Sequence, residues 1–125
     1  MEDELVQLAT IYSSPGFLLL ASDDEGQPVG CVGLRMLQPS IGPRSGEIRR
    51  LFVRDSARAT GLGRSLASRL IELALTEKFD RLVLNTLPEM TEAVGLYRAL
   101  GFGPVDPYVD EPIEDTLYFG LELSP

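Results

Sequence analysis

The segment Arg58-Ala-Thr-Gly61-Leu-Gly63 has the residue types of an anion-binding loop. It lies between a β-favouring run that ends at Val53 and a helical repeat of leucines that begins at Leu62. Glycines at the first turn of a helix let backbone N–H groups approach a ligand closely, and the positive end of the helix dipole favours an anion there. The segment therefore predicts a phosphate site, and a diphosphate would suit it.

Two nucleotide-binding motifs use similar loops and fit this segment less well. The dinucleotide fingerprint needs a third glycine three residues after Gly63, where the chain has Leu66. The Walker loop needs Gly-Lys followed by Ser or Thr, where the chain has Gly63-Arg64-Ser65. Both nucleotide interpretations are therefore disfavoured.

The residues available for proton transfer and metal binding are few. Histidine is absent and Cys31 is the single cysteine, so Ser–His and Cys–His nucleophiles and the usual zinc sites are excluded. We expect no metal, and we expect Cys31 to be a small, buried apolar residue of a strand. Any acid or base must be a carboxylate, a tyrosine, a lysine, a cysteine or a water.

The elements around the loop follow from apolar periodicity. The leucine repeat predicts a helix from Leu62 to about Thr76, and Arg81–Thr86 predicts a strand. The order strand, helix, strand implies a right-handed crossover and a parallel pair. A second helix is predicted from Pro88 to Leu100, with Gly101 as its left-handed cap and Phe102 closing on Tyr97.

The whole chain is predicted to form one domain over residues 1–125, and 44% of its residues are apolar and can form a core. The spacing of apolar residues predicts a helix over Met1–Tyr12, a hairpin of Gly16–Ala21 with Val29–Leu37, and a terminal strand over Thr116–Leu123. There is neither a signal peptide pattern nor an apolar run of membrane-spanning length. We therefore expect a cytoplasmic protein that does not associate with membranes.

Two motifs resemble those of the GNAT acetyltransferase superfamily. The first, Gln/Arg-x-x-Gly-x-Gly/Ala, is matched by Arg58, Gly61 and Gly63. The second, Ala-x-x-Leu-Tyr-x-x-x-Gly-Phe, is matched by Ala93, Leu96, Tyr97, Gly101 and Phe102. The resemblance extends over about Gly16 to Leu123. It implies an α/β GNAT fold, a mixed central sheet flanked by helices.

The resemblance also implies a function, which is acetyl-CoA-dependent transfer of an acetyl group to a primary amine by direct attack on the thioester. The CoA diphosphate would be held by the loop residues Arg58, Ala59, Thr60, Gly61, Leu62, Gly63 and Arg64. The pantetheine arm would pair with the strand at Leu51, Phe52 and Val53.

The same resemblance makes two residues candidates for proton transfer. Tyr97 is the candidate acid for the departing thiolate, and its alternative role is that of a core aromatic residue. Glu47, eleven residues before Arg58, is the candidate base, and its alternative role is that of a surface carboxylate on an edge strand. Both alternatives remain open at this point.

The chain departs from the family pattern in two places. Met90 stands where an asparagine often opens the second motif, so the contact of that side chain would be missing or replaced. We also expect the usual first strand and first helix to be absent, which would expose a sheet edge and favour a homodimer or an unusually open acceptor site. These departures support the alternative of a non-catalytic acyl-CoA-binding or regulatory module.

The charge distribution suits an anionic cofactor and an amine acceptor. Residues 44–69 contain seven arginines and two acids, whereas the whole chain has a net charge of −8. An acidic chain is a poor partner for nucleic acid, and its acidic remainder favours a cationic acceptor. The sequence does not say which amine is the acceptor.

Overall fold

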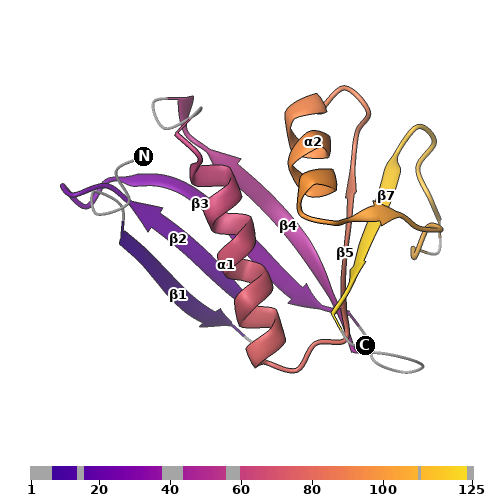
Figure 1. Ribbon diagram of the computed structural model, residues 1–125, viewed down its shortest axis with the longest axis horizontal. Helices are drawn as coiled ribbons and strands as arrows, with labels where there is room; N and C mark the ends of the chain where they lie inside the picture. The colour runs from indigo at the N-terminus through magenta and orange to yellow at the C-terminus, as the bar shows by residue number, and fades with distance from the viewer. Residues whose placement is uncertain (1–6, 14–15, 38–43, 56–59, 110, 124–125) are drawn as a thin grey trace.

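The part of the chain that the structure describes forms a seven-stranded sheet with two helices on one face (Figure 1). The computed structural model describes residues 7–13, 16–37, 44–55, 60–109 and 111–123. The strand order in the sheet is β1-β2-β3-β4-β5-β7-β6. The strands are β1 (Gln7–Ser13), β2 (Gly16–Ser22), β3 (Pro28–Met36), β4 (Ser45–Val53), β5 (Arg81–Thr86), β6 (Gly103–Pro104) and β7 (Leu117–Glu122). The helices are α1 (Leu62–Thr76) and α2 (Thr91–Ala99).

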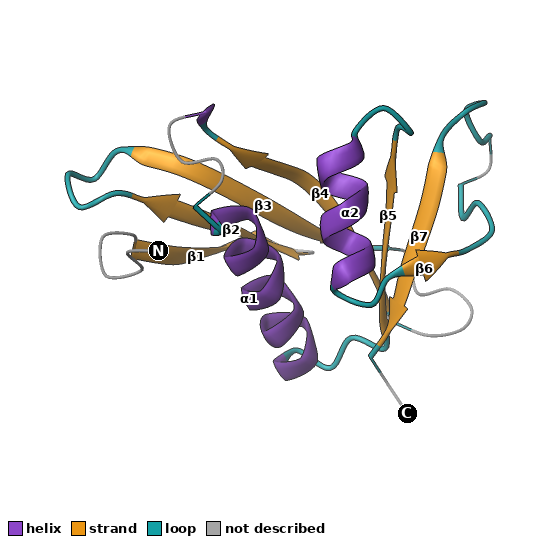
Figure 2. Ribbon diagram, turned by 45° about the horizontal axis from the view of Figure 1, so that its top comes forward, coloured by secondary structure: helices purple, strands orange, loops and turns teal. Residues whose placement is uncertain are grey.

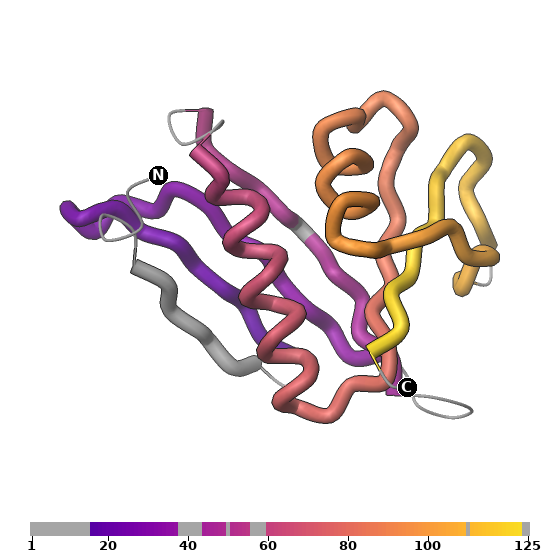
Figure 3. The backbone as a smooth tube through the Cα atoms, viewed as in Figure 1, coloured from indigo at the N-terminus to yellow at the C-terminus, as the bar shows by residue number. Residues whose placement is uncertain are grey.

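The core lies between the sheet and the two helices, which cover the same face (Figure 2). Helix α1 runs obliquely across β2, β3 and β4 (Figure 3). Alternate side chains of β2 and β3 and the leucine stripe of α1 are almost fully buried there, as Leu19, Val32, Leu62, Leu66 and Leu70 show. Burial of these residues supplies the main stabilisation of the fold.

Most predicted elements are confirmed. Helix α1 and strand β5 have the predicted bounds, and β2 and β3 form the predicted antiparallel hairpin. Strands β4 and β5 are parallel, as the crossover rule requires. Helix α2 begins at Thr91, whereas Pro88 and Glu89 lie in a turn ahead of it.

The end of α2 has the predicted left-handed cap. Gly101 has a φ of 102°, which a residue with a side chain adopts only with strain. The Phe102 N–H donates to the Tyr97 carbonyl and the Gly101 N–H donates to the Arg98 carbonyl, each at 3.0 Å. The rings of Tyr97 and Phe102 meet edge to face with centroids 5.3 Å apart. This is a complete Schellman motif with its apolar contact.

The predicted helix over Met1–Tyr12 is wrong for the part that the structure describes. Residues 7–13 form β1, which pairs antiparallel with β2 from Gln7 opposite Ser22 to Ser13 opposite Gly16. Residues 1–6 lie outside the described residues. Thr10-Ile11-Tyr12 is a β-favouring run, and the unpaired backbone groups of β2 favour a strand over a short helix. The edge of β2, which was expected to be uncovered, is therefore paired.

Strands β4 and β5 pair over a short length and then separate. Ser45, Gly46 and Glu47 face Arg81, Leu82 and Val83, and the pairing ends there. In Figure 1 the two strands meet near the lower end of β5 and diverge above it, where α2 lies in front. Beyond Glu47, the side of β4 that faces β5 therefore has no strand partner among the described residues.

Candidate functional site

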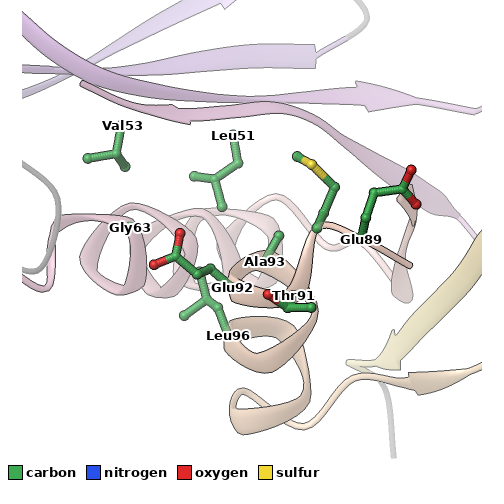
Figure 4. Close-up of a pocket in the computed structure, with 9 residues that line it drawn as sticks. Leu51, Val53, Gly63, Glu89, Thr91, Glu92, Ala93 and Leu96 are labelled. Atoms are coloured by element: carbon green, nitrogen blue, oxygen red, sulfur yellow. The ribbon is translucent and has the colours of Figure 1, made fainter. Parts of the chain in front are cut away.

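A cavity of about 380 Å³ lies beside this separation (Figure 4). Its walls come from the end of β4, the first turn of α1 and the beginning of α2. The volume is in the range of small-molecule and cofactor sites. The lining residues are Leu51, Val53, Gly63, Glu89, Met90, Thr91, Glu92, Ala93 and Leu96.

The first turn of α1 presents backbone donors at one end of this cavity. Gly61 precedes the helix with a φ of 85°, and no side chain of the described residues caps the helix. The N–H groups of the first helical residues have no acceptor within the helix, and no acid lies in the first turn. This helix end therefore keeps its donors and its positive dipole for an anion.

A bulge in β4 decides which of the three residues that were expected to contact the pantetheine arm face the helices. The β3–β4 register changes between Cys31, which faces Phe52, and Gly33, which faces Arg49. Leu51 and Val53 line the cavity on the helix side, while the Phe52 side chain is 55% exposed and lies outside the cavity lining. A bulge commonly redirects side chains beside an active site in this way.

Helix α2 contributes the opposite wall, which sequence reasoning did not assign to the site. Met90 precedes the helix without a side-chain cap, and it lines the cavity with Ala93 and Leu96. The polar contact that an asparagine would make is therefore replaced by an apolar thioether. Glu89 and Glu92 place carboxylates at the same wall (Figure 4).

The predicted loop residues fall into three groups. Arg58 and Ala59 lie outside the described residues. Thr60 and Gly61 form the turn before α1, and Arg64 is exposed on the first turn of the helix. Leu62 is buried in the core, which leaves its backbone N–H as the group able to meet a ligand.

Glu47 lies at the point where β4 and β5 separate, on the face opposite the helices. Its neighbour Ile48 packs in the core under α1, so the alternation of β4 directs Glu47 to the other face. The residue is 5% exposed on a central strand, so the alternative of a surface carboxylate on an edge strand is wrong.

Four side chains surround the Glu47 carboxylate. The Arg35 Nη2 donates to Oε1 at 2.9 Å, and the Arg49 Nε lies 3.8 Å from the same oxygen. The Tyr108 hydroxyl donates to Oε2 at 2.8 Å, and the Asn85 Nδ2 lies 3.4 Å from Oε2. Burial, and then the hydrogen bond to Glu47, raise the pKa of Tyr108 above its ordinary value. The group is a buried carboxylate held between guanidinium and phenol donors.

Tyr97 belongs to the core beneath α2. Its side chain is 4% exposed, and it is not among the residues that line the cavity. Burial raises the pKa of Tyr97 from 10.0 to about 12. Tyr97 is therefore not part of the cavity wall. It also does not contact Glu47, because the two residues lie on opposite faces of the sheet.

None of the four side chains around Glu47, which with it form the Glu47 cluster, was assigned to this site from the sequence. Tyr108 comes from the proline-rich connection between β6 and β7, whose path over the sheet has no local signal. Asn85 is a polar residue at an alternate position of β5, and Arg35 is the cross-strand neighbour of Glu47. The strand pattern could have indicated Asn85, whereas Arg35 needs the β3–β4 register.

Among the residues described, no helix is long and apolar enough to cross a membrane.

A mixed sheet whose parallel strands separate beside a glycine-rich helix start is the fold of a GNAT acetyltransferase. The chain matches the acetyltransferase (GNAT) family over residues 2–102 and belongs to that family. An uncharacterized N-acetyltransferase of Schizosaccharomyces pombe is 35% identical over 99% of this chain and 75% of its own length.

Solved structures show the same fold. A GNAT family acetyltransferase from Elizabethkingia anophelis with acetyl-CoA bound has a TM-score of 0.74 at 20% identity, over 96% of this chain and 99% of that one. A chain of the NatC complex bound to Gag peptide and CoA has a TM-score of 0.75 at 23% identity, over 86% of this chain and 71% of that one.

Proposed function

We propose that this chain is an N-acetyltransferase that uses acetyl-CoA and acetylates a primary amine. The observation that carries the proposal is the separation of β4 and β5, which leaves an opening between the two chemically different faces of the sheet. On one side lie the cavity and the open helix start at Gly63, and on the other lies the Glu47 cluster. A thioester placed in the opening would meet an amine arriving from the opposite face.

The residues fit the proposed cofactor. Donors at the start of α1 suit the diphosphate, and the apolar wall of Leu51, Val53 and Leu96 suits the pantetheine arm. The backbone of β4 beyond Glu47 offers amide groups to the peptide-like bonds of that arm, because pairing with β5 has ended. We assign cofactor binding to Leu51, Phe52, Val53 and residues 58–64.

The proposed reaction is a direct transfer. The amine nitrogen attacks the thioester carbonyl carbon, the C–S bond breaks, and the electron pair leaves with the sulfur. The nitrogen loses a proton, for which Glu47 is the proposed acceptor. Tyr97 is kept as the proposed donor to the thiolate although it is buried and outside the cavity lining, so its role in the core alone is the alternative to be tested. Glu47 accepts the proton either directly or through the Tyr108 hydroxyl that contacts it.

Cofactor binding can be tested at Gly63. A Cβ there would lie 3.6 Å from Val53 and 3.8 Å from Leu96, so the fold tolerates Gly63→Ala while the cavity becomes smaller. We expect acetyl-CoA at 100 times its Kd to stabilise the wild type by about 2.7 kcal/mol. Thermal denaturation should show a much smaller shift for Gly63→Ala and none for Gly63→Val. Gly95→Ala, whose Cβ meets nothing within 4 Å, is the matched control and should keep the full shift. Equal shifts in all four proteins would contradict the assignment.

The second candidate function is a non-catalytic acyl-CoA-binding module. The three hydrogen bonds that the Glu47 carboxylate already accepts favour it, because they leave few acceptor sites for a substrate proton. Thioester turnover with a panel of primary amines distinguishes the two functions. A thermal shift without turnover on any amine would support the binding module.

A cytoplasmic homodimer remains part of the proposal, although its basis has changed. The edge of β2 is paired, so the remaining candidate for a twofold interface on that side is the outer edge of β1. Light scattering at high micromolar concentration should give twice the chain mass of 13.7 kDa. A monomer under these conditions would remove the proposal.

A further inference from the structure

The sheet face opposite the helices carries two arginines, Arg35 and Arg49, beside Glu47, and we call the position above Gly33 next to them the hollow. Four positions of β3 and β4 form its corners, because Glu47 faces Arg35 and Arg49 faces Gly33 in the register. Side chains of directly opposed residues lie about 5 Å apart. Three corners are charged, and the fourth, Gly33, has no side chain.

The Gly33 corner has room for a ligand group. A Cβ built there would meet its nearest neighbours, the Arg49 carbonyl oxygen and Leu18 Cδ1, at 3.5 and 3.7 Å. These are ordinary van der Waals distances, so a small group fits at this position and crowding does not require a glycine there. No positive φ requires glycine at this position. The missing side chain therefore leaves a gap between two cationic side chains rather than relieving strain.

The charges of the hollow do not cancel. Arg35 and Arg49 carry two positive charges, and Glu47 supplies one negative charge. The side chains of Arg35 and Arg49 are 51% and 44% exposed, so both guanidinium groups remain accessible. Each guanidinium has five N–H donors in a planar fork that matches a carboxylate. A local excess of +1 stands out on a chain whose net charge is −8.

We infer that the hollow binds the carboxylate of the acceptor, and that the acceptor is a small amino acid rather than a simple amine or a polyamine. This rests on the proposed acetyl transfer. A carboxylate above Gly33 lies about one strand spacing, ~5 Å, from β4. The amino group of the same small molecule then points toward Glu47 and the opening between β4 and β5. Arg49 is the proposed principal ligand, since its contact with Glu47 is the longer of the two.

The test compares acceptors that differ only in the carboxylate. Turnover is measured with a panel of amino acids, their carboxamides and their decarboxylated amines. We expect an amino acid to be preferred, and Arg49→Gln to raise its KM by about 10- to 100-fold, the range for losing a hydrogen bond to a charged group. The KM values for the amide and the amine should stay unchanged. Gly33→Val should impair the amino acid in the same way by filling the hollow.

Arg69→Gln is the matched control, because Arg69 is 49% exposed on α1 and pairs with Glu72 away from this face. It removes the same charge and should leave every KM unchanged. Turnover that is indifferent to the carboxylate, or equal effects of the two arginine variants, would overturn the inference while leaving acetyl transfer intact. If no acceptor is turned over, the proposed function fails. In that case, binding of amino acids to the hollow is tested separately by their effect on the melting temperature in the presence of CoA. The absence of a shift, or a shift that is unchanged in Arg49→Gln, would overturn the inference.

Discussion

Glu47→Gln is expected to lower the turnover of a true acceptor by about 10²- to 10⁴-fold, the usual contribution of a general base. The amide has the shape of the carboxylate: its oxygen can still accept from Arg35, and its NH2 group can donate to the Tyr108 hydroxyl oxygen, but it cannot take up a proton. The acid limb of the pH–rate profile should flatten, because that limb reports protonation of the base. Steady-state kinetics over a pH series measures both effects.

A structural role of Glu47 predicts something different. Removing the negative charge leaves the partly exposed Arg35 without its partner, and this would appear as a lower melting temperature. For a base, acetyl-CoA should still stabilise the variant, and the loss of turnover should greatly exceed any loss of folded protein. Wild-type turnover in Glu47→Gln would exclude the residue as the base, and turnover that falls only in proportion to the folded fraction would make it a structural anchor.

The parts of the fold that the sequence predicted correctly are those with local signals. The leucine repeat set both ends of α1, and Gly101 marked the end of α2 through its left-handed conformation. The two glycines of the loop, Gly61 and Gly63, likewise marked the start of α1. Such features depend on residues a few positions apart, so they can be predicted from the local sequence.

The parts that were missed depend on distant neighbours. Whether Gln7–Ser13 becomes a helix or a strand is decided by the backbone of β2, which no local period reveals. Tyr108 reaches Glu47 across 61 residues of sequence through a connection without regular structure. The sequence therefore pointed to Glu47 as a chemical group but not to the side chains that determine whether it can act.

Register shifts limit prediction in a second way. Leu51, Phe52 and Val53 were assigned together to the pantetheine contact, yet the β4 bulge turns Leu51 and Val53 to the cavity and Phe52 away from it. One extra residue in a strand moves every later side chain to the other face. Nothing in the composition of β4 indicates where that residue lies.

Tyr97 poses the last problem, because its phenol is a much weaker acid than an exposed one. With a pKa of about 12 it stays protonated at every working pH, so the proton is always present. Transfer to a thiolate, whose pKa is near 8.5 in cysteine, is nevertheless uphill by about 5 kcal/mol. A hydrogen bond from the phenol to the departing sulfur is therefore the larger part of the proposed role, and the effect should lie near the low end of general-acid catalysis.

Tyr97→Phe is accordingly expected to lower kcat about 10²-fold while the acetyl-CoA thermal shift is retained, because the ring that packs on Phe102 remains. A second readout reports burial independently of catalysis. The native state keeps the Tyr97 proton above pH 10 while the unfolded state releases it, so this residue stabilises the fold below pH 10 and that contribution is lost as the pH rises toward 12. Denaturation curves of Tyr97→Phe should therefore depend less on pH in this window than those of the wild type. Unchanged kcat together with this weaker pH dependence would assign Tyr97 to the core alone, and proton transfer would then run through water or the acceptor.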